Sequence, residues 1–466
     1  MNEVTHKIER AAVSTAIDQV LKYVKDPEKR QERLLNIVDL TQKFAGSQFS
    51  DKGYANARAM ISDPDSKWMQ YINRLLNELN PNVAKMTLLD LGFESMYYGT
   101  KCIRESRAKY HCNVPWLILM DPTSACNLHC TGCWAAEYGN KLNLSFDDLD
   151  RVVTQAKELG IHFFMFTGGE PLVRKNDLIK LCEKHQDCAF HAYTNGTLID
   201  DAFCKELQRV GNFSFSISLE GFEAVNDSRR GAGDFEKVEK AMKLLKEYGI
   251  FFGTSICYTR ANIETVTSDE FLDMLIERGC RFSWYFHYMP VGNAAAVELL
   301  PTPEQREYMY HRIREIRANE GGKQIYVMDF QNDGEFVGGC IAGGRNYCHI
   351  NANGDMEPCV FIHYSSANIH NCSVLEALQQ PLFMEYRARQ PFNQNELRPC
   401  PMLENPEMLQ EMVKNSGAKS TDLQSPESAE HLCGKCQEYA ANWKVKADEI
   451  WANNPHHKQY YENYRK

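Results

Sequence analysis

Residues 116–134 run Trp116-Leu-Ile-Leu-Met120-Asp-Pro-Thr-Ser-Ala-Cys126-Asn-Leu-His-Cys130-Thr-Gly-Cys133-Trp134. In this stretch an apolar run is followed directly by a loop that contains three cysteines. The run is typical of a short buried strand. The cysteines are separated by three and then by two residues, so a single metal centre within the loop could bind all three thiolates.

The cysteine loop suits an iron-sulfur cluster better than zinc. A [4Fe-4S] cluster is normally held by four thiolates, so a set of three leaves one iron open to another ligand. Zinc sites usually pair two short Cys loops, or Cys with His at a longer separation, whereas His129 lies inside this loop. Packing gives no reason to gather three free thiols in one loop. We therefore favour a cluster and keep zinc as the alternative.

A second motif, Gly168-Gly-Glu-Pro171, follows another apolar run. Together the two motifs resemble the radical S-adenosylmethionine (SAM) superfamily. The resemblance implies that the open iron binds SAM and that an electron from the cluster cleaves SAM to a 5'-deoxyadenosyl radical. This radical abstracts hydrogen from a substrate. The cluster ligands implied by the resemblance are Cys126, Cys130 and Cys133.

The resemblance also assigns residues to SAM. Gly168 and Gly169 allow a sharp backbone bend because they carry no Cβ, and Glu170 would accept hydrogen bonds from the SAM ammonium group. Arg230 would pair with the SAM carboxylate, since a planar guanidinium makes two-point contacts. The other residues expected to contact SAM are Pro171, Asn195, Ser218, Glu220 and Trp134.

Several of these positions leave alternatives open. The family often has an aromatic residue just before the third cysteine, whereas this chain has Gly132. Trp134 either replaces that contact to adenine or only shields the cluster. Asn195 either touches SAM or forms a turn. Cys257 lies on a predicted strand whose inward positions face the radical, and it is our candidate catalytic residue.

The C-terminal part contains a second group of cysteines. Cys340, Cys348 and Cys359, the last in a Gly-x4-Cys turn, resemble the auxiliary-cluster domain called SPASM. The resemblance implies at least one auxiliary [4Fe-4S] cluster, held by these three thiols and one distal thiol. The distal thiols could instead form a second cluster or bind a single metal ion. They are Cys400, Cys433 and Cys436.

From residue 113 onward, short apolar strands alternate with amphipathic helices, which predicts an α/β fold with parallel strands. Six such units match the partial (β/α)6 barrel of the resembled family, in which active residues gather at the C-terminal strand ends. We expect the polar segment 415–430 to be a mobile insertion. The expected strands are 116–120, 163–167, 190–194, 213–219, 251–258 and 282–288. The expected domains are a helical N-terminal extension at 1–112, the barrel at 113–297, a linker helix at 298–325, and a small Cys-rich domain with a C-terminal helix at 326–466.

Composition restricts the class of protein. The chain has 466 residues and a formal net charge of -10, which disfavours a nucleic-acid partner. The N-terminal sequence lacks the apolar core of a signal peptide, and we find no run of transmembrane length. We therefore expect a cytoplasmic protein whose 17 cysteines stay reduced, in an anaerobic organism because such clusters are oxygen-sensitive.

These features predict a radical SAM enzyme that abstracts hydrogen from a peptide or protein and so oxidises, crosslinks or rearranges it. A lipid, a sugar or another small molecule is the alternative substrate. A reductant such as flavodoxin or ferredoxin would supply the electron. A different class, a non-catalytic iron-sulfur electron carrier or redox sensor, is disfavoured because a carrier has no use for an ammonium-binding turn at Gly168–Pro171.

Overall fold

A nine-stranded sheet forms the centre of the protein. The computed structural model describes residues 3–45, 51–135, 138–139, 141–293 and 295–454. The strand order is β7-β6-β5-β4-β3-β2-β1-β8-β9, and every pair is parallel except β8 with β9. The strands are β1 (Leu117–Met120), β2 (Phe163–Phe166), β3 (Ala189–Thr194), β4 (Phe213–Ser218), β5 (Phe252–Tyr258), β6 (Phe282–His287), β7 (Tyr326–Asp329), β8 (Tyr347–Ile350) and β9 (Met356–Glu357).

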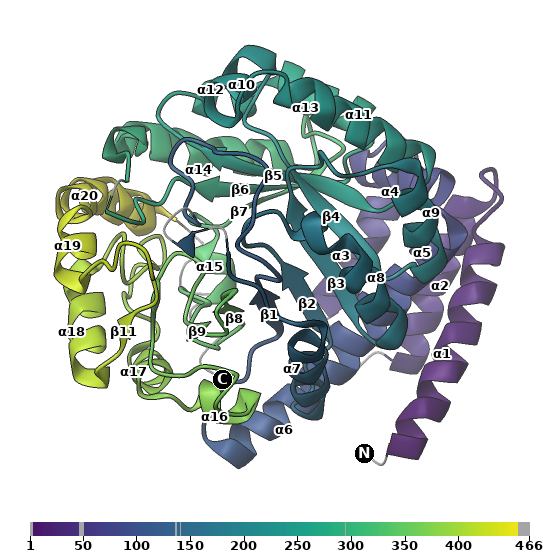
Figure 1. Ribbon diagram of the computed structural model, residues 1–466. Coiled ribbons are helices and arrows are strands. Elements are labelled where there is room, and N and C mark those ends of the chain that lie inside the picture. Colours follow the sequence, from purple (N-terminus) through teal and green to yellow (C-terminus); the bar gives the residue numbers. More distant parts are fainter. Residues whose placement is uncertain (1–2, 46–50, 136–137, 140, 294, 455–466) are drawn as a thin grey trace.

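Helices cover the outer face of the curved sheet (Figure 1). They are α7 (Phe146–Glu158), α8 (Lys175–Lys184), α9 (Asp201–Val210), α10 (Glu223–Arg230), α11 (Asp234–Glu247), α12 (Ile263–Val266) and α13 (Asp269–Glu277). Buried side chains such as Ile118, Phe164 and Phe190 pack into the apolar core between strands and helices. The six predicted strands and the partial-barrel fold are confirmed. The short helices α10 and α12 have eight and four residues, which is too few to show the periodicity by which a helix is predicted.

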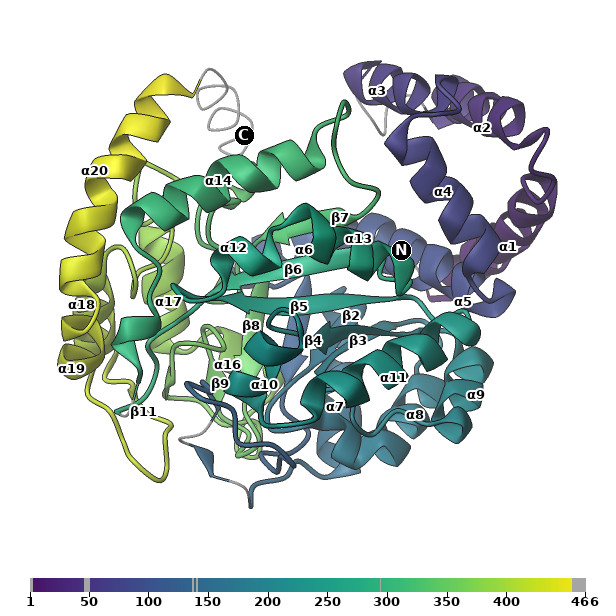
Figure 2. The ribbon, with the colours of Figure 1, turned by 90° about the horizontal axis from the view of Figure 1, so that it is seen from above.

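The N-terminal region is helical, as predicted. Its elements are α1 (Glu3–Tyr23), α2 (Arg30–Ala45), α3 (Asp51–Ser62), α4 (Lys67–Glu78), α5 (Pro81–Met86), the π-helical segment η2 (Thr87–Gly99) and α6 (Thr100–Tyr110). Helices α1 to α4 stand to one side of the sheet (Figure 2). Polar contacts fasten α4 to the rest of the chain, since Lys67 donates to the Ile316 carbonyl at 2.9 Å and Arg74 to the Ile276 carbonyl at 2.7 Å.

The C-terminal region continues the same sheet. β7 pairs with β6, and β8 pairs with β1, so the sheet crosses the predicted boundary at residue 326; the domain limits themselves stay a prediction. The further elements are η4 (Pro171–Arg174), η5 (Val297–Leu299), α14 (Pro303–Arg317), α15 (Gly334–Val337), β10 (Tyr364–Ser365), α16 (Val374–Leu378), α17 (Pro381–Arg389), α18 (Pro406–Ser416), β11 (Lys419–Ser420), α19 (Ala429–Gly434) and α20 (Gln437–Asn453).

The polar segment 415–430, expected to be a mobile insertion, is instead packed against the domain. β11 pairs with β10, and the buried carboxylate of Asp422 lies 2.6 Å from Nδ1 of His363. Polar composition misled the prediction because these polar side chains are satisfied inside the protein.

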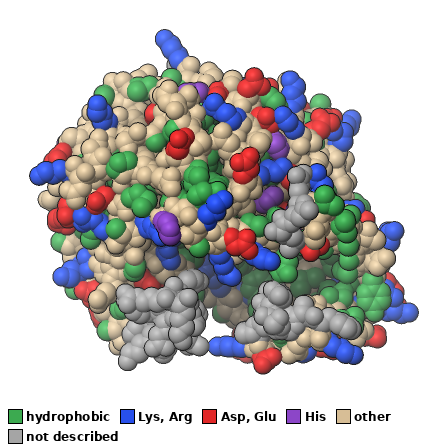
Figure 3. All heavy atoms as spheres, turned by 90° about the horizontal axis from the view of Figure 1, so that it is seen from below, with side chains coloured by type: hydrophobic (Ala, Val, Ile, Leu, Met, Phe, Trp, Pro, Cys, Tyr) green, Lys and Arg blue, Asp and Glu red, His purple; other side chains and the backbone are tan. Residues whose placement is uncertain are grey.

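The surface carries mixed charge. Lys and Arg side chains lie among Asp and Glu over the face seen from below (Figure 3). In the part of the chain that the structure describes, no helix is both long and apolar enough to cross a membrane.

Candidate active site

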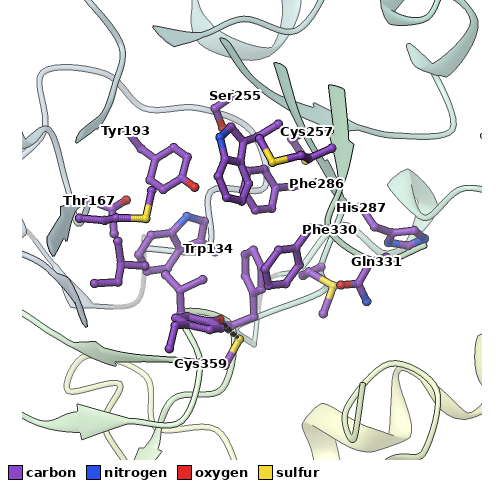
Figure 4. A pocket seen from close by; sticks show the side chains of 18 of the residues that line it. Trp134, Thr167, Tyr193, Ser255, Cys257, Phe286, His287, Phe330, Gln331 and Cys359 are labelled. Atoms are coloured by element: carbon purple, nitrogen blue, oxygen red, sulfur yellow. Dashed lines mark hydrogen bonds between the residues drawn. The ribbon is translucent and has the colours of Figure 1, made fainter. Parts of the chain in front are cut away.

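A cavity of about 850 Å³ opens at the C-terminal ends of the barrel strands and extends to the C-terminal cysteines. Figure 4 shows Thr167, Tyr193 and Trp134 on one side of it and Phe330 and Cys359 on another. Pro171, Cys348, Cys433 and Cys436 are not among the residues that line the cavity. The predicted site residues that do line it are Cys126, Cys130, Cys133, Trp134, Gly168, Gly169, Glu170, Asn195, Ser218, Glu220, Arg230, Cys257, Cys340, Cys359 and Cys400.

The cysteine loop forms one wall of this cavity. The Leu128 N–H donates to Sγ of Cys126 at 3.4 Å, and a guanidinium nitrogen of Arg230 lies 3.9 Å from Sγ of Cys130. Burial raises the pKa of Cys126 to about 11, so its thiolate needs a bound cation to be stable. Three thiols on one wall beside a cationic side chain suit an iron-sulfur cluster.

The loop does not have the geometry of a single-ion site. Among the described residues, no three His, Cys, Asp or Glu side chains gather as a lone metal ion requires. In a four-iron cluster each iron takes its own thiolate, so the three thiols of the loop do not have to meet at one atom.

Gly132 explains the departure from the family's aromatic residue. It adopts φ of +67°, and a Cβ there would lie 2.9 Å from Cε2 of Tyr288. Tyr288 thus fills the place where a side chain at position 132 would go. The aromatic ring at this point comes from the end of β6, which a local motif cannot reveal.

Trp134 lies in an aromatic cage. Its ring is edge-on to those of Tyr138, His349, Phe361 and His363, with centroids 5.8–6.3 Å apart. The two histidines and the phenylalanine belong to the C-terminal domain, so the indole joins the cysteine loop to that domain. These contacts fit the shielding interpretation of Trp134, and its contact to adenine stays a prediction.

The Gly-Gly-Glu-Pro turn packs directly on the cysteine loop. The Glu170 N–H donates to the Ala125 carbonyl at 2.8 Å, and a Cβ at Gly169 would overlap the Ala125 backbone. The buried carboxylate of Glu170 accepts hydrogen bonds from the Thr194 hydroxyl at 2.6 Å and from the Asn195 N–H at 2.8 Å. Glu170 therefore joins the loop after β2 to the end of β3, and its contact to SAM stays a prediction.

Asn195 forms the turn that was its alternative role. Its side-chain oxygen accepts from the Thr197 N–H at 3.0 Å, and its amide donates to Asn127 at 2.8 Å. Pro171 is buried and begins the short helix η4. Both residues thus support the shape of the site.

Glu220 binds two arginines at the base of the cavity. Its buried carboxylate lies 2.7 Å from Arg229 and 2.5 Å from Arg230. Burial opposes the charge on Glu220, but the arginines outweigh burial and lower its pKa. Arg229 was not among the predicted site residues, yet it lines the cavity beside Cys257 and Ser218.

The C-terminal cysteines lie in different surroundings, some at the cavity and one in the outer core. Cys340, Cys359 and Cys400 line the cavity. Cys348 faces the other side of β8 and is buried in the outer core opposite Ile118. Successive side chains of a strand point to opposite faces, so the structure does not bring Cys348 to the other thiols, and the expectation that it joins them is corrected.

The buried Cys433 lies closer to the set than its sequence position suggests. Cys433 belongs to one buried cluster of side chains with Tyr386 and Cys359, and Cys340 and Cys400 pack against that cluster. Cys436 is adjacent to Cys433, with its N–H donating to the Cys433 carbonyl at 3.0 Å. The C-terminal thiols that belong to this cluster or pack against it are Cys340, Cys359, Cys400, Cys433 and Cys436.

A buried imidazole behind the cavity is held between two acids. His349 lies 2.9 Å from Asp121 and 2.6 Å from Glu357. Burial opposes its charge, but the two carboxylates outweigh burial and raise the pKa of His349 to about 10. Asp121 precedes the cysteine loop and Glu357 belongs to β9, so this ion triad joins both regions.

The triad predicts a loss of stability in alkali. The pKa of His349 is raised from 6.5 to about 10. The charged imidazole therefore contributes fully to the free energy of unfolding below pH 6.5, and this contribution disappears as the pH rises to about 10. We expect the melting temperature of the wild type to fall across this range more steeply than that of His349→Gln. The matched control is His191→Gln, because burial lowers the pKa of His191 to about 3. Equal slopes in the wild type and His349→Gln would contradict a charged His349.

Comparison with known proteins identifies both regions. Residues 120–276 match the Radical SAM superfamily, and residues 340–402 match SPASM, an iron-sulfur cluster-binding domain. The chain therefore contains a radical SAM domain followed by a SPASM domain. These two domains imply SAM, a [4Fe-4S] cluster and auxiliary iron-sulfur as cofactors.

The relatives act on different substrates. AdoMet-dependent heme synthase of Nitratidesulfovibrio vulgaris is 26% identical over 61% of this chain and 84% of that protein. PqqA peptide cyclase of Granulibacter bethesdensis is 27% identical over 58% and 72% of the two chains. The crystal structure of Streptococcus suis SuiB bound to S-adenosylmethionine has a TM-score of 0.54, 19% identity, and coverage of 77% of this chain and 83% of that one. The last likeness shows the shared fold.

Proposed function

We propose that this enzyme abstracts hydrogen from a peptide or protein substrate and so oxidises, crosslinks or rearranges it. The bound cluster and SAM supply a 5'-deoxyadenosyl radical. Glu170, Ser218 and Arg230 would orient SAM, while the thiols of Cys126, Cys130 and Cys133 would hold the cluster. The observation that carries this proposal is the single cavity, which these residues share with Cys340, Cys359 and Cys400.

The walls between the two groups of cysteines are aromatic. Tyr193 meets Trp284 and Phe286 edge-on, with centroids 6.3 and 5.7 Å apart, and Phe286 lies 5.3 Å from Phe330. Such walls exclude water and would bind an apolar part of a substrate. Exclusion of water protects a carbon radical from side reactions. Cys257 faces the same space and stays our candidate for a substrate-side role.

A small-molecule substrate is the second candidate. Heme synthases are among the relatives, whereas the PqqA peptide cyclase among them supports a peptide substrate. A relative's substrate does not transfer by fold alone. The predicted reductant, flavodoxin or ferredoxin, belongs to the same proposal. The electron-carrier alternative does not fit a chain whose relatives are synthases and maturases.

The test begins with the anaerobically reconstituted, reduced protein and SAM. We expect 5'-deoxyadenosine in the products. An intact cluster that yields none would contradict the proposal. Peptide and tetrapyrrole candidates, deuterated at carbon, then separate the two substrates, because deuterium is expected in 5'-deoxyadenosine only with the true substrate.

A further inference from the structure

Two buried tyrosines lie near the C-terminal thiols: Tyr347 lines the cavity, and Tyr386 packs in the same buried cluster as Cys359. The Tyr347 hydroxyl on β8 donates a hydrogen bond to Sγ of Cys359 at 2.6 Å, drawn as a dashed line in Figure 4. Tyr386 on α17 is fully buried, and its hydroxyl has no hydrogen-bond partner among the described residues. A buried hydroxyl without a hydrogen-bond partner is unfavourable. The Tyr386 hydroxyl can therefore donate a hydrogen bond to an acceptor that a bound group supplies.

Tyr386 belongs to the same buried cluster of side chains as Cys359 and Cys433, and Cys340 and Cys400 pack against that cluster. We assign these four thiols to the auxiliary site, because a complete [4Fe-4S] cluster takes four thiolates. The missing acceptor is therefore expected to be a sulfur atom of the cluster.

The protein fixes the Tyr386 ring in place. The ring packs so closely on Gly343 that a Cβ there would overlap it. On another side it meets Phe392 edge-on, with centroids 5.2 Å apart. A ring held on two sides directs its hydroxyl toward one position.

We propose that Tyr347 and Tyr386 are positioning residues whose hydroxyls donate hydrogen bonds to the auxiliary cluster and raise its reduction potential. The inference rests on the proposed ligand role of the four surrounding thiols. Reduction adds a negative charge to the cluster, and a hydrogen bond to sulfur stabilises that charge. Cluster potentials depend on such bonds.

The experiment uses full-length protein in which Cys126, Cys130 and Cys133 are replaced by alanine, so that only auxiliary iron remains. The midpoint potential of the auxiliary cluster is measured by redox titration followed by electron paramagnetic resonance. Tyr386→Phe and Tyr347→Phe should each lower the potential. A tenfold change in the oxidised-to-reduced ratio corresponds to about 59 mV for one electron, and we expect a shift of this order. The control is Tyr285→Phe, a buried tyrosine whose hydroxyl donates to the Val266 carbonyl at 2.6 Å.

Each outcome decides one part of the proposal. Unchanged potentials in both phenylalanine variants, with iron retained, would overturn the role of the hydroxyls and leave the cluster assignment intact. Loss of iron from both variants would also overturn it, since a residue that only tunes the potential is not needed to hold iron. A parent protein without any iron would instead refute the proposed auxiliary site.

Discussion

Replacement of Cys130 by alanine is expected to abolish 5'-deoxyadenosine formation. Cys130 is the central thiol of the loop and lies 3.9 Å from Arg230, on the wall that also carries Glu170. Without this thiolate the loop offers two sulfur ligands, and a cluster held by two thiolates is not expected to form. Product after anaerobic incubation with SAM and dithionite is measured by chromatography.

The control for this variant is Cys102→Ala. Cys102 lies on α6, outside the cavity, and is half-buried. It should keep both its iron and its product yield. An undiminished yield from Cys130→Ala would refute the assignment of the loop as the cluster site, whereas equal losses in both variants would point to damage of the fold.

The barrel could be predicted from sequence because its signals are local. The run Phe163–Phe166 is wholly apolar, and Phe213–Ser218 alternates apolar residues with serine. Both patterns mark strands, and the intervening helices are amphipathic. The cysteine loop and the Gly-Gly-Glu-Pro turn are likewise continuous in sequence. Their packing on one another follows from strand order, since the ends of β1 and β2 are neighbours.

The parts that sequence did not reveal depend on distant contacts. Tyr288 supplies the ring beside Gly132 from the end of another strand, and Tyr386 approaches its thiols from a helix. His349 and Tyr347 could have been found through the alternation of β8, because side chains two apart share a face. The same alternation would have excluded Cys348, which spacing alone grouped with Cys359.

Replacement of Cys359 by alanine should therefore lower the iron content of the protein, whereas replacement of Cys348 should not. With one cluster in each domain the wild type should bind about eight iron atoms. Cys359→Ala should bind less iron than the wild type, since removal of one of four thiolates weakens the hold on the auxiliary cluster. Cys348→Ala should keep all of its iron, because this thiol is buried in the outer core opposite Ile118. Iron is counted by colorimetric assay after anaerobic reconstitution.

The paired design separates a ligand from a buried side chain. Both cysteines are buried in the same domain, so a general loss of folding would affect the two variants alike. Cys348→Ala removes one sulfur from a packed core and should lower the melting temperature slightly without changing the iron content. Loss of the auxiliary iron from Cys348→Ala, with the iron retained in Cys359→Ala, would contradict the orientation of the side chains on β8. It would also contradict the hydrogen bond from Tyr347 to Cys359.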